Sequence, residues 1–219
     1  MISFNIMDEQ GRLTNAGALL ADDSPIRHSR LFCTRWNGLD KGSSRIDTLD
    51  EGEYSGSVIS LIENGEASIK RNSRLMWRKT ANSREEMPEY VERSYHEALI
   101  NAIAHRDYLV NGSEVHIDIF DDRLEIYSPG GMMDGTLIQN IDPFTVPSKR
   151  RNPALADILE RLGYKDWGIW NAREVDLKKS STAIPFRSIT KRGRPEIPVE
   201  PKRLFGDFAK LKLCEEYKP

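Results

Sequence analysis

The 219-residue sequence predicts an α/β fold, and three segments carry this prediction. The segment that contains Glu97 has leucine, alanine and isoleucine at helical spacing, which favours a helix packed on a sheet. Residues 114–120 and 123–127 alternate apolar and polar side chains around a short acidic turn, as the two strands of a hairpin do. A further helix is predicted from Pro153, because proline is favoured at the first position of a helix.

The other elements follow from caps and periodicity. Thr14 is expected to cap a short helix, and residues 30–35 and 74–79 are expected to form strands. Residues 49–71 carry apolar positions at helical spacing, so one amphipathic helix is predicted there despite its three glycines. In the helix after Pro153, Asn152 is the expected cap, and the side chains expected to face the core are Leu155, Ile158, Leu159 and Leu162.

Composition narrows the class of protein. With 30% charged and 38% hydrophobic residues, the chain is typical of a soluble globular protein. No apolar run approaches membrane-spanning length, and residues 1–10 lack the basic start and apolar centre of a signal peptide. We therefore expect a cytoplasmic protein that does not engage a membrane. Cys33 and Cys214 are far apart, so both are expected to be free thiols.

Charge is unevenly distributed along the chain. Residues 165–219 hold 13 Lys and Arg against 8 Asp and Glu, a net charge of +5, whereas residues 1–164 carry −7. A basic tail can bind nucleic acid through phosphates. The alternative is a poorly ordered segment, which its five prolines and weak periodicity favour.

The most informative residues form a polar stripe on the predicted helix. Glu97, Asn101 and His105 are spaced four apart and so share one face. A carboxylate and an amide stacked in this way can hold a water and a hard cation, and magnesium prefers oxygen ligands and keeps several waters. The alternative is a solvated helix face. The hairpin and the glycine turn that follow favour a nucleotide-binding cleft.

These residues also resemble a known family. Glu97 and Asn101 match the helical Glu-x-x-x-Asn motif of the GHKL ATPases. As an ordered set, the motifs resemble the C-terminal ATPase-like module of Schlafen/AlbA-type bacterial transcriptional regulators, also described as RecG-related helicase-like proteins. The resemblance spans roughly residues 11–164 and rests on these segments: 13–20, 95–108, 115–126, Ser128-Pro129-Gly130-Gly131 and Arg151-Asn152-Pro153.

The resemblance implies a two-layer α/β sandwich of the GHKL type that binds ATP and magnesium. Asn101 would hold magnesium, and Glu97 would position or activate water as the catalytic residue. The turn that contains Gly130 and Gly131 would admit the base. GHKL ATPases generally carry an aspartate where this chain has Ser128, and that carboxylate accepts a hydrogen bond from the adenine amino group. Serine lacks the charge that strengthens this contact, so weaker adenine binding is expected.

Each of the other candidate residues has a structural alternative. His105 and Arg106 could contact phosphate, or they could stabilise the end of the helix, where cations are favoured. The Ser128–Gly131 turn could approach a ligand closely, or it could simply end a strand. Lys149, Arg150 and Arg151 form a basic cluster that could meet phosphate or DNA, although such loops are usually solvated.

The glycine-rich lid that the resemblance leads one to expect after Gly163 is missing. Synonymous codons for residues 169–180 exist that spell M-E-R-A-G-S-G-F-K-K-I in another frame, which suggests a frameshift after about residue 164. The N-terminal Schlafen/AlbA domain also has no counterpart, so a truncated start is expected. We accordingly divide the chain into a leader (1–47), a GHKL-like domain (48–164) and a divergent, partly disordered basic tail (165–219).

Three functions remain open on this basis. The first is an ATP-binding regulatory module with weak or no hydrolysis. The second is a non-enzymatic DNA-associated or protein-interaction module, and the third is an inactive gene fragment. The expected partners are a nucleotide and, as further candidates, DNA and a second copy of the chain.

Overall fold

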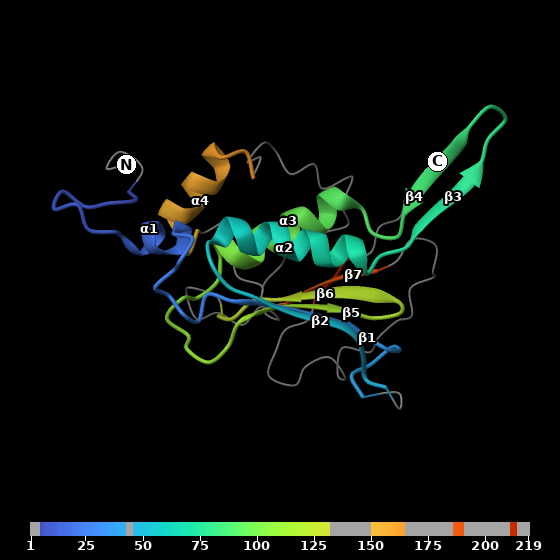
Figure 1. The fold of residues 1–219 in the computed structure, drawn as a ribbon, viewed down its shortest axis with the longest axis horizontal. Helices are drawn as coiled ribbons and strands as arrows, with labels where there is room; N and C mark the ends of the chain where they lie inside the picture. Colours follow the sequence, from blue (N-terminus) through green and yellow to red (C-terminus); the bar gives the residue numbers. More distant parts are fainter. Residues whose placement is uncertain (1–4, 43–45, 132–149, 165–185, 191–210, 214–219) are drawn as a thin grey trace.

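The chain forms a mixed α/β fold in a computed structural model that describes residues 5–42, 46–131, 150–164, 186–190 and 211–213 (Figure 1). The main sheet has the strand order β2-β1-β5-β6-β7-β8. β1 runs parallel to β5 and β7 parallel to β8, and the other neighbouring pairs are antiparallel. The strands are β1 (Leu31–Trp36), β2 (Thr48–Tyr54), β5 (Val115–Ile119), β6 (Arg123–Tyr127), β7 (Phe186–Thr190) and β8 (Leu211–Leu213).

Helices α2 and α3 cover one face of this sheet (Figure 1). In the described residues the helices are α1 (Asn15–Leu20), α2 (Val58–Arg71), α3 (Glu92–Ala104) and α4 (Pro153–Arg161). The core lies between the helices and the sheet, and its completely buried side chains include Leu31, Ile62, Leu99, Ile117 and Leu124. This burial supplies the main favourable term for folding. The mixed α/β class predicted from the sequence is therefore confirmed.

Several local predictions are also confirmed. Thr14 caps α1, since its hydroxyl oxygen accepts from the Gly17 backbone N–H at 3.1 Å. β5 and β6 form the predicted hairpin, with Asp118 opposite Glu125. α4 begins at Pro153 and buries three of the four side chains expected in the core. The prediction is wrong for Leu162, which follows the end of α4 and is 56% exposed.

The long helix predicted over residues 49–71 is wrong in its first part. Residues Thr48–Tyr54 form β2, an edge strand of the main sheet, and the helix begins only at Val58. Gly56 separates the two elements with a φ of +117°, a conformation that glycine adopts without steric cost. Ser57 then caps α2, because its hydroxyl oxygen accepts from the Ser60 N–H at 3.2 Å.

Segments outside the predicted domain also join the sheet. β1 lies within the expected leader (1–47), yet it pairs with both β2 and β5, and Leu31 and Cys33 are buried in the core. Within the expected tail, β7 pairs with β6 and β8 pairs with β7. The prediction of disorder for the rest of the tail concerns residues 165–185, 191–210 and 214–219, which lie outside the described residues.

A second, two-stranded sheet stands apart from the main one. β3 (Leu75–Lys79) and β4 (Arg84–Pro88) form an antiparallel hairpin that projects from the body of the fold (Figure 1). The strand expected near 74–79 is therefore present, but its partner strand was not predicted. In the described part of the chain, no helix is both long and apolar enough to cross a membrane.

Candidate functional site

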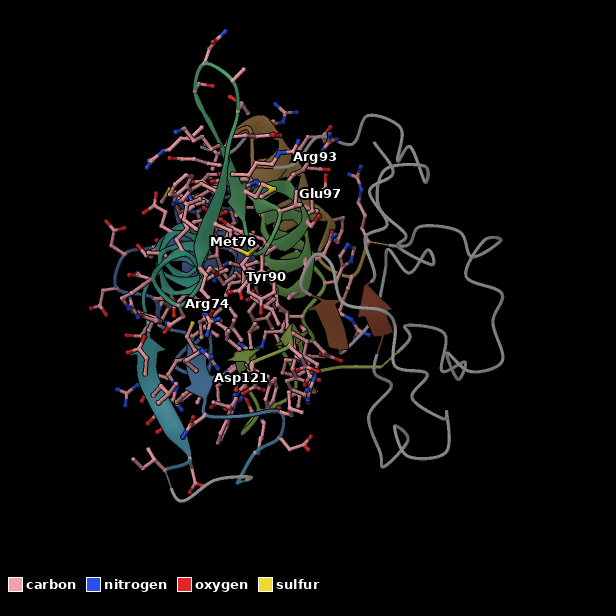
Figure 2. All side chains as sticks on the ribbon, turned by 90° about the vertical axis from the view of Figure 1, so that its right-hand side faces the viewer. Arg74, Met76, Tyr90, Arg93, Glu97 and Asp121 are labelled. Carbon is pink, nitrogen blue, oxygen red and sulfur yellow. The ribbon has the colours of Figure 1, made fainter. Side chains whose placement is uncertain are left out.

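Helix α3 carries the polar stripe on which the sequence prediction rests. Glu97 is partly exposed and makes a long ion pair with Arg93 one turn earlier, with 3.4 Å between Oε1 and Nε (Figure 2). Asn101, one turn later, is only 5% exposed, and its backbone carbonyl accepts from the His105 N–H at 3.0 Å. The stripe therefore begins at the partly exposed carboxylate of Glu97 and continues to the buried amide of Asn101.

The stripe leads to the C-terminal end of α3, whose last carbonyls are bound by side chains from beyond the helix. The Ser128 hydroxyl donates to the Ala102 carbonyl at 2.6 Å. The Tyr108 hydroxyl donates to the Ile103 carbonyl at 3.1 Å, and the Asn152 amide donates to the Ala104 carbonyl at 3.0 Å. These helix-end carbonyls have no intrahelical partner. Ser128 joins the end of α3 to the segment after β6, Asn152 joins it to the start of α4, and Tyr108 binds it from the loop that follows the helix.

The same contact bears on the expected role of Ser128. The resemblance places this residue where it would accept from an adenine amino group. In the structure the hydroxyl is 5% exposed and donates to the end of α3. Its proton is therefore committed to a structural contact, and a neutral, buried oxygen is a weaker acceptor than a carboxylate.

The glycine turn after Ser128 packs against the residues that follow α3. The Pro129 carbonyl accepts from the Asp107 N–H at 2.9 Å. Gly130 has a φ of +120°, and a Cβ at this position would lie 2.8 Å from the Asp107 Cβ. The glycine is thus required by close contact within the chain. Gly131 differs, because a Cβ there would meet no atom within 4 Å.

Arg150 and Arg151, the described members of the basic cluster, both pair with carboxylates. Arg151 pairs with Asp107, with 2.6 Å between Nη1 and Oδ2, and also donates to the Gly131 carbonyl. Arg150 pairs with Asp157 and lies 3.9 Å from a carboxylate oxygen of Glu160. Lys149 lies outside the described residues. Arg151 therefore fastens the glycine turn to the segment after α3.

His105 and Arg106 lie at the end of α3 in buried positions. Arg106 is 1% exposed, donates to the Ser113 carbonyl at 2.7 Å and lies 5.0 Å above the centre of the Tyr108 ring. Burial lowers the pKa of its guanidinium. His105 is the C-cap residue of α3 and is 8% exposed. For Arg106 these contacts favour the structural alternative, because the guanidinium organises the loop after the helix.

The candidate residues suit magnesium better than they suit an adenine base. Asn101 and Glu97 supply an amide and a carboxylate one turn apart, a donor set that suits magnesium and an ordered water. In the described part of the chain, no three His, Cys, Asp or Glu side chains gather to hold a metal on their own. A magnesium ion at Asn101 would therefore take its remaining ligands from phosphate and water. Where the resemblance implies a charged acceptor for the base, Ser128 supplies a neutral hydroxyl.

Asn152 is the N-cap residue of α4, as predicted, but the sequence did not reveal what its side chain binds. Asn152 was expected to cap α4, but its side chain makes no capping bond there and instead donates to the carbonyls of Ala104 and Arg106, at 3.0 and 2.8 Å. Its position just before Pro153 is a correct signal for the start of a helix. No local signal reveals that the end of another helix lies within reach.

The contacts of the Asn152 side chain lead to a prediction. Asn152→Asp should lower the free energy of unfolding by about 1–3 kcal/mol, because a carboxylate cannot donate to two buried carbonyls. Aspartate is as good an N-cap as asparagine, so unchanged stability in urea denaturation would instead indicate that residue 152 acts as the cap of α4.

Comparisons with known proteins bear on the fold and on the part of the chain that follows α3. A family model described as "Putative ATP-dependent DNA helicase recG C-terminal" matches residues 112–180, a range that includes β5, β6, the glycine turn and α4. It extends beyond residue 164, where the resemblance was expected to end. The match supports a RecG-related, ATPase-like module. A search of curated proteins gives no match.

A solved structure shares the fold. The chain is similar to the DIP2311 protein from Corynebacterium diphtheriae, with 21% sequence identity and a TM-score of 0.61. The similarity covers 74% of this chain and 32% of the other, so the present chain spans about a third of that protein's length. At this identity the comparison bears on the fold alone.

Proposed function

We propose that the chain is a nucleotide-binding regulatory module of the GHKL type, with weak ATP binding and little or no hydrolysis. The observation that best supports this proposal is that the Ser128–Gly131 turn is hydrogen-bonded to the end of α3, beside Asn101. The Ser128 hydroxyl binds the Ala102 carbonyl, and the Pro129 carbonyl accepts from the Asp107 N–H. The polar stripe of α3 and the glycine turn thus lie side by side. In a nucleotide site of this arrangement the stripe would bind the phosphates through magnesium, and the turn would lie against the base. The family match, described in terms of an ATP-dependent helicase, supports the same class.

Each residue of the proposed site has a distinct role. The Asn101 amide oxygen would bind magnesium, which supplies charge neutralisation for the phosphates. Glu97 would hold the attacking water, and its partial exposure leaves it accessible from solvent. The glycine turn would lie under the base. The proposed setting is a cytoplasmic bacterial transcriptional regulator that also contacts DNA.

Two features of the chain argue for weak binding. The place of the adenine-binding carboxylate is taken by a neutral hydroxyl whose proton is donated to Ala102. Loss of one charge-assisted hydrogen bond is typically worth about 1.5–3 kcal/mol, or roughly ten- to a hundredfold in affinity. The sequence also lacks the recognisable glycine-rich lid that would exclude water and supply backbone donors to the phosphates.

Calorimetry with ATP, with and without magnesium chloride, tests the proposal. We expect weak binding by the wild-type chain that strengthens with magnesium, and loss of the magnesium dependence in Asn101→Ala. Phosphate release should stay at background. Because Asn101 is buried, circular dichroism must first show that this variant is folded.

Three outcomes would change the conclusion. Tight binding with turnover that Glu97→Ala abolishes would assign an active ATPase. Absence of ATP binding at millimolar concentration in a folded chain would favour the non-enzymatic interaction module. Equal binding by the wild-type chain and a folded Asn101→Ala variant would remove Asn101 from the metal site.

A further inference from the structure

The β3–β4 hairpin is a projecting arm whose apolar side chains are open to solvent. All five residues of β3 are exposed, and three consecutive ones are large and apolar: Leu75 at 59%, Met76 at 41% and Trp77 at 57% exposure. Figure 2 shows the hairpin rising beyond the helices and the main sheet. A two-stranded hairpin on its own is only marginally stable in water, and an exposed apolar patch is typical of an interaction site. The arm is therefore a candidate binding surface.

The base of the arm is firmly attached. The Glu89 carboxylate accepts from the Arg74 N–H at 3.0 Å, and the Glu89 N–H donates to the Arg74 carbonyl at the same distance. Glu89 and Tyr90 are 5% and 2% exposed. The arm therefore leaves the body from a buried, hydrogen-bonded base, and its strands are held out in a defined direction.

Charge on the arm disfavours a nucleic acid partner. Arg78 pairs with Glu85 across the two strands at 2.8 Å, and Arg84 pairs with Glu86. Residues 75–88 hold three basic and two acidic side chains, a net charge of +1. A phosphate backbone needs several free cations. Among the described residues, the apolar surface of the arm is left exposed to solvent. A nearly neutral arm also does not repel its own copy.

We propose that the arm associates with the same arm of a second copy of this chain, through the outer edge of β3. Antiparallel pairing centred on Trp77 places each Trp77 against its copy, Leu75 opposite Lys79, and Met76 opposite Arg78. This register brings no like charges directly opposite each other. Centring on Arg78 would oppose the two Arg78 side chains, and β4-to-β4 pairing centred on Glu86 would oppose two glutamates.

The size of the arms sets the strength of the association. An interface between two five-residue strands and their side chains falls below the standard range, which begins at about 1,200 Å² in total. Interfaces smaller than this belong to weak or transient complexes. The expected dimer is therefore concentration-dependent, with a Kd on the order of 10 µM.

Sedimentation velocity of the full chain over a range from about 1 to 200 µM tests this association. Wild-type protein should shift from monomer to dimer, and Trp77→Ser should raise the Kd at least tenfold. Leu49→Ser is the matched control, because Leu49 is also 57% exposed but lies on β2, the edge of the main sheet. It should dimerise as wild type does.

Cross-linking tests the register. In a Cys214→Ser background, a mixture of the Leu75→Cys and Lys79→Cys variants should form a disulfide-linked dimer, while each variant alone should not. In this pairing the two copies of residue 75 lie four residues apart along the strand, about 13 Å. A wild-type chain that stays monomeric at 200 µM overturns the proposal, as does a dimer lost in Leu49→Ser instead. A monomer that binds duplex DNA through Trp77 would assign the arm to nucleic acid.

Discussion

Leu99→Ala is expected to lower the free energy of unfolding by about 2–5 kcal/mol, a large part of the total for a domain of this size. Leu99 is completely buried on α3. A Cβ added to Gly65 of α2 would lie 2.7 Å from the Leu99 Cδ2 and 2.9 Å from the Leu31 Cδ2, so the three residues meet where α2, α3 and β1 are closest. The truncated side chain would leave a cavity at this junction.

Urea denaturation followed by circular dichroism measures the effect. Leu109→Ala is the matched control, because it removes the same atoms from a side chain that is 90% exposed. Its stability should change by less than about 0.5 kcal/mol. Equal losses in the two variants would contradict the packing of α3 against α2 and β1, and with it the position of the polar stripe.

Gly130→Ala is expected to destabilise the chain by about 2–4 kcal/mol. The residue has a φ of +120°, which side chains rarely adopt, and the added methyl would meet the Asp107 Cβ at 2.8 Å. Because the Pro129 carbonyl and the Arg151 side chain both bind Asp107, the turn cannot simply move away. The site beside Asn101 should be disturbed together with stability.

Gly131→Ala separates this steric effect from a general preference for glycine. A Cβ on Gly131 meets no atom within 4 Å, so thermal unfolding of this variant should resemble that of wild type to within about 1 kcal/mol. If Gly131→Ala were the more damaging change, the close approach of Gly130 to Asp107 would be wrong.

The local sequence pattern was sufficient to predict several elements of the fold. The β5–β6 hairpin, α3 and the start of α4 follow from alternation, helical spacing and Pro153, and Thr14 caps α1 as expected. Local pattern failed at residues 48–54, where an edge strand with apolar and acidic side chains imitates a helix face. It also did not reveal β4, because the exposed hairpin lacks a buried face.

The candidate site divides in the same way. The sequence by itself determined that Glu97 and Asn101 share one helix face, because a spacing of four residues is a property of the helix alone. Only the tertiary structure decided that Ser128 and Asn152 bind the end of α3 and that Gly130 packs on Asp107. Helix-end carbonyls accept from any donor that folding brings within reach. Ser128 lies 26 positions along the chain from Ala102, whose carbonyl it binds, and Asn152 lies 48 positions from Ala104. No local periodicity encodes which distant side chain arrives there.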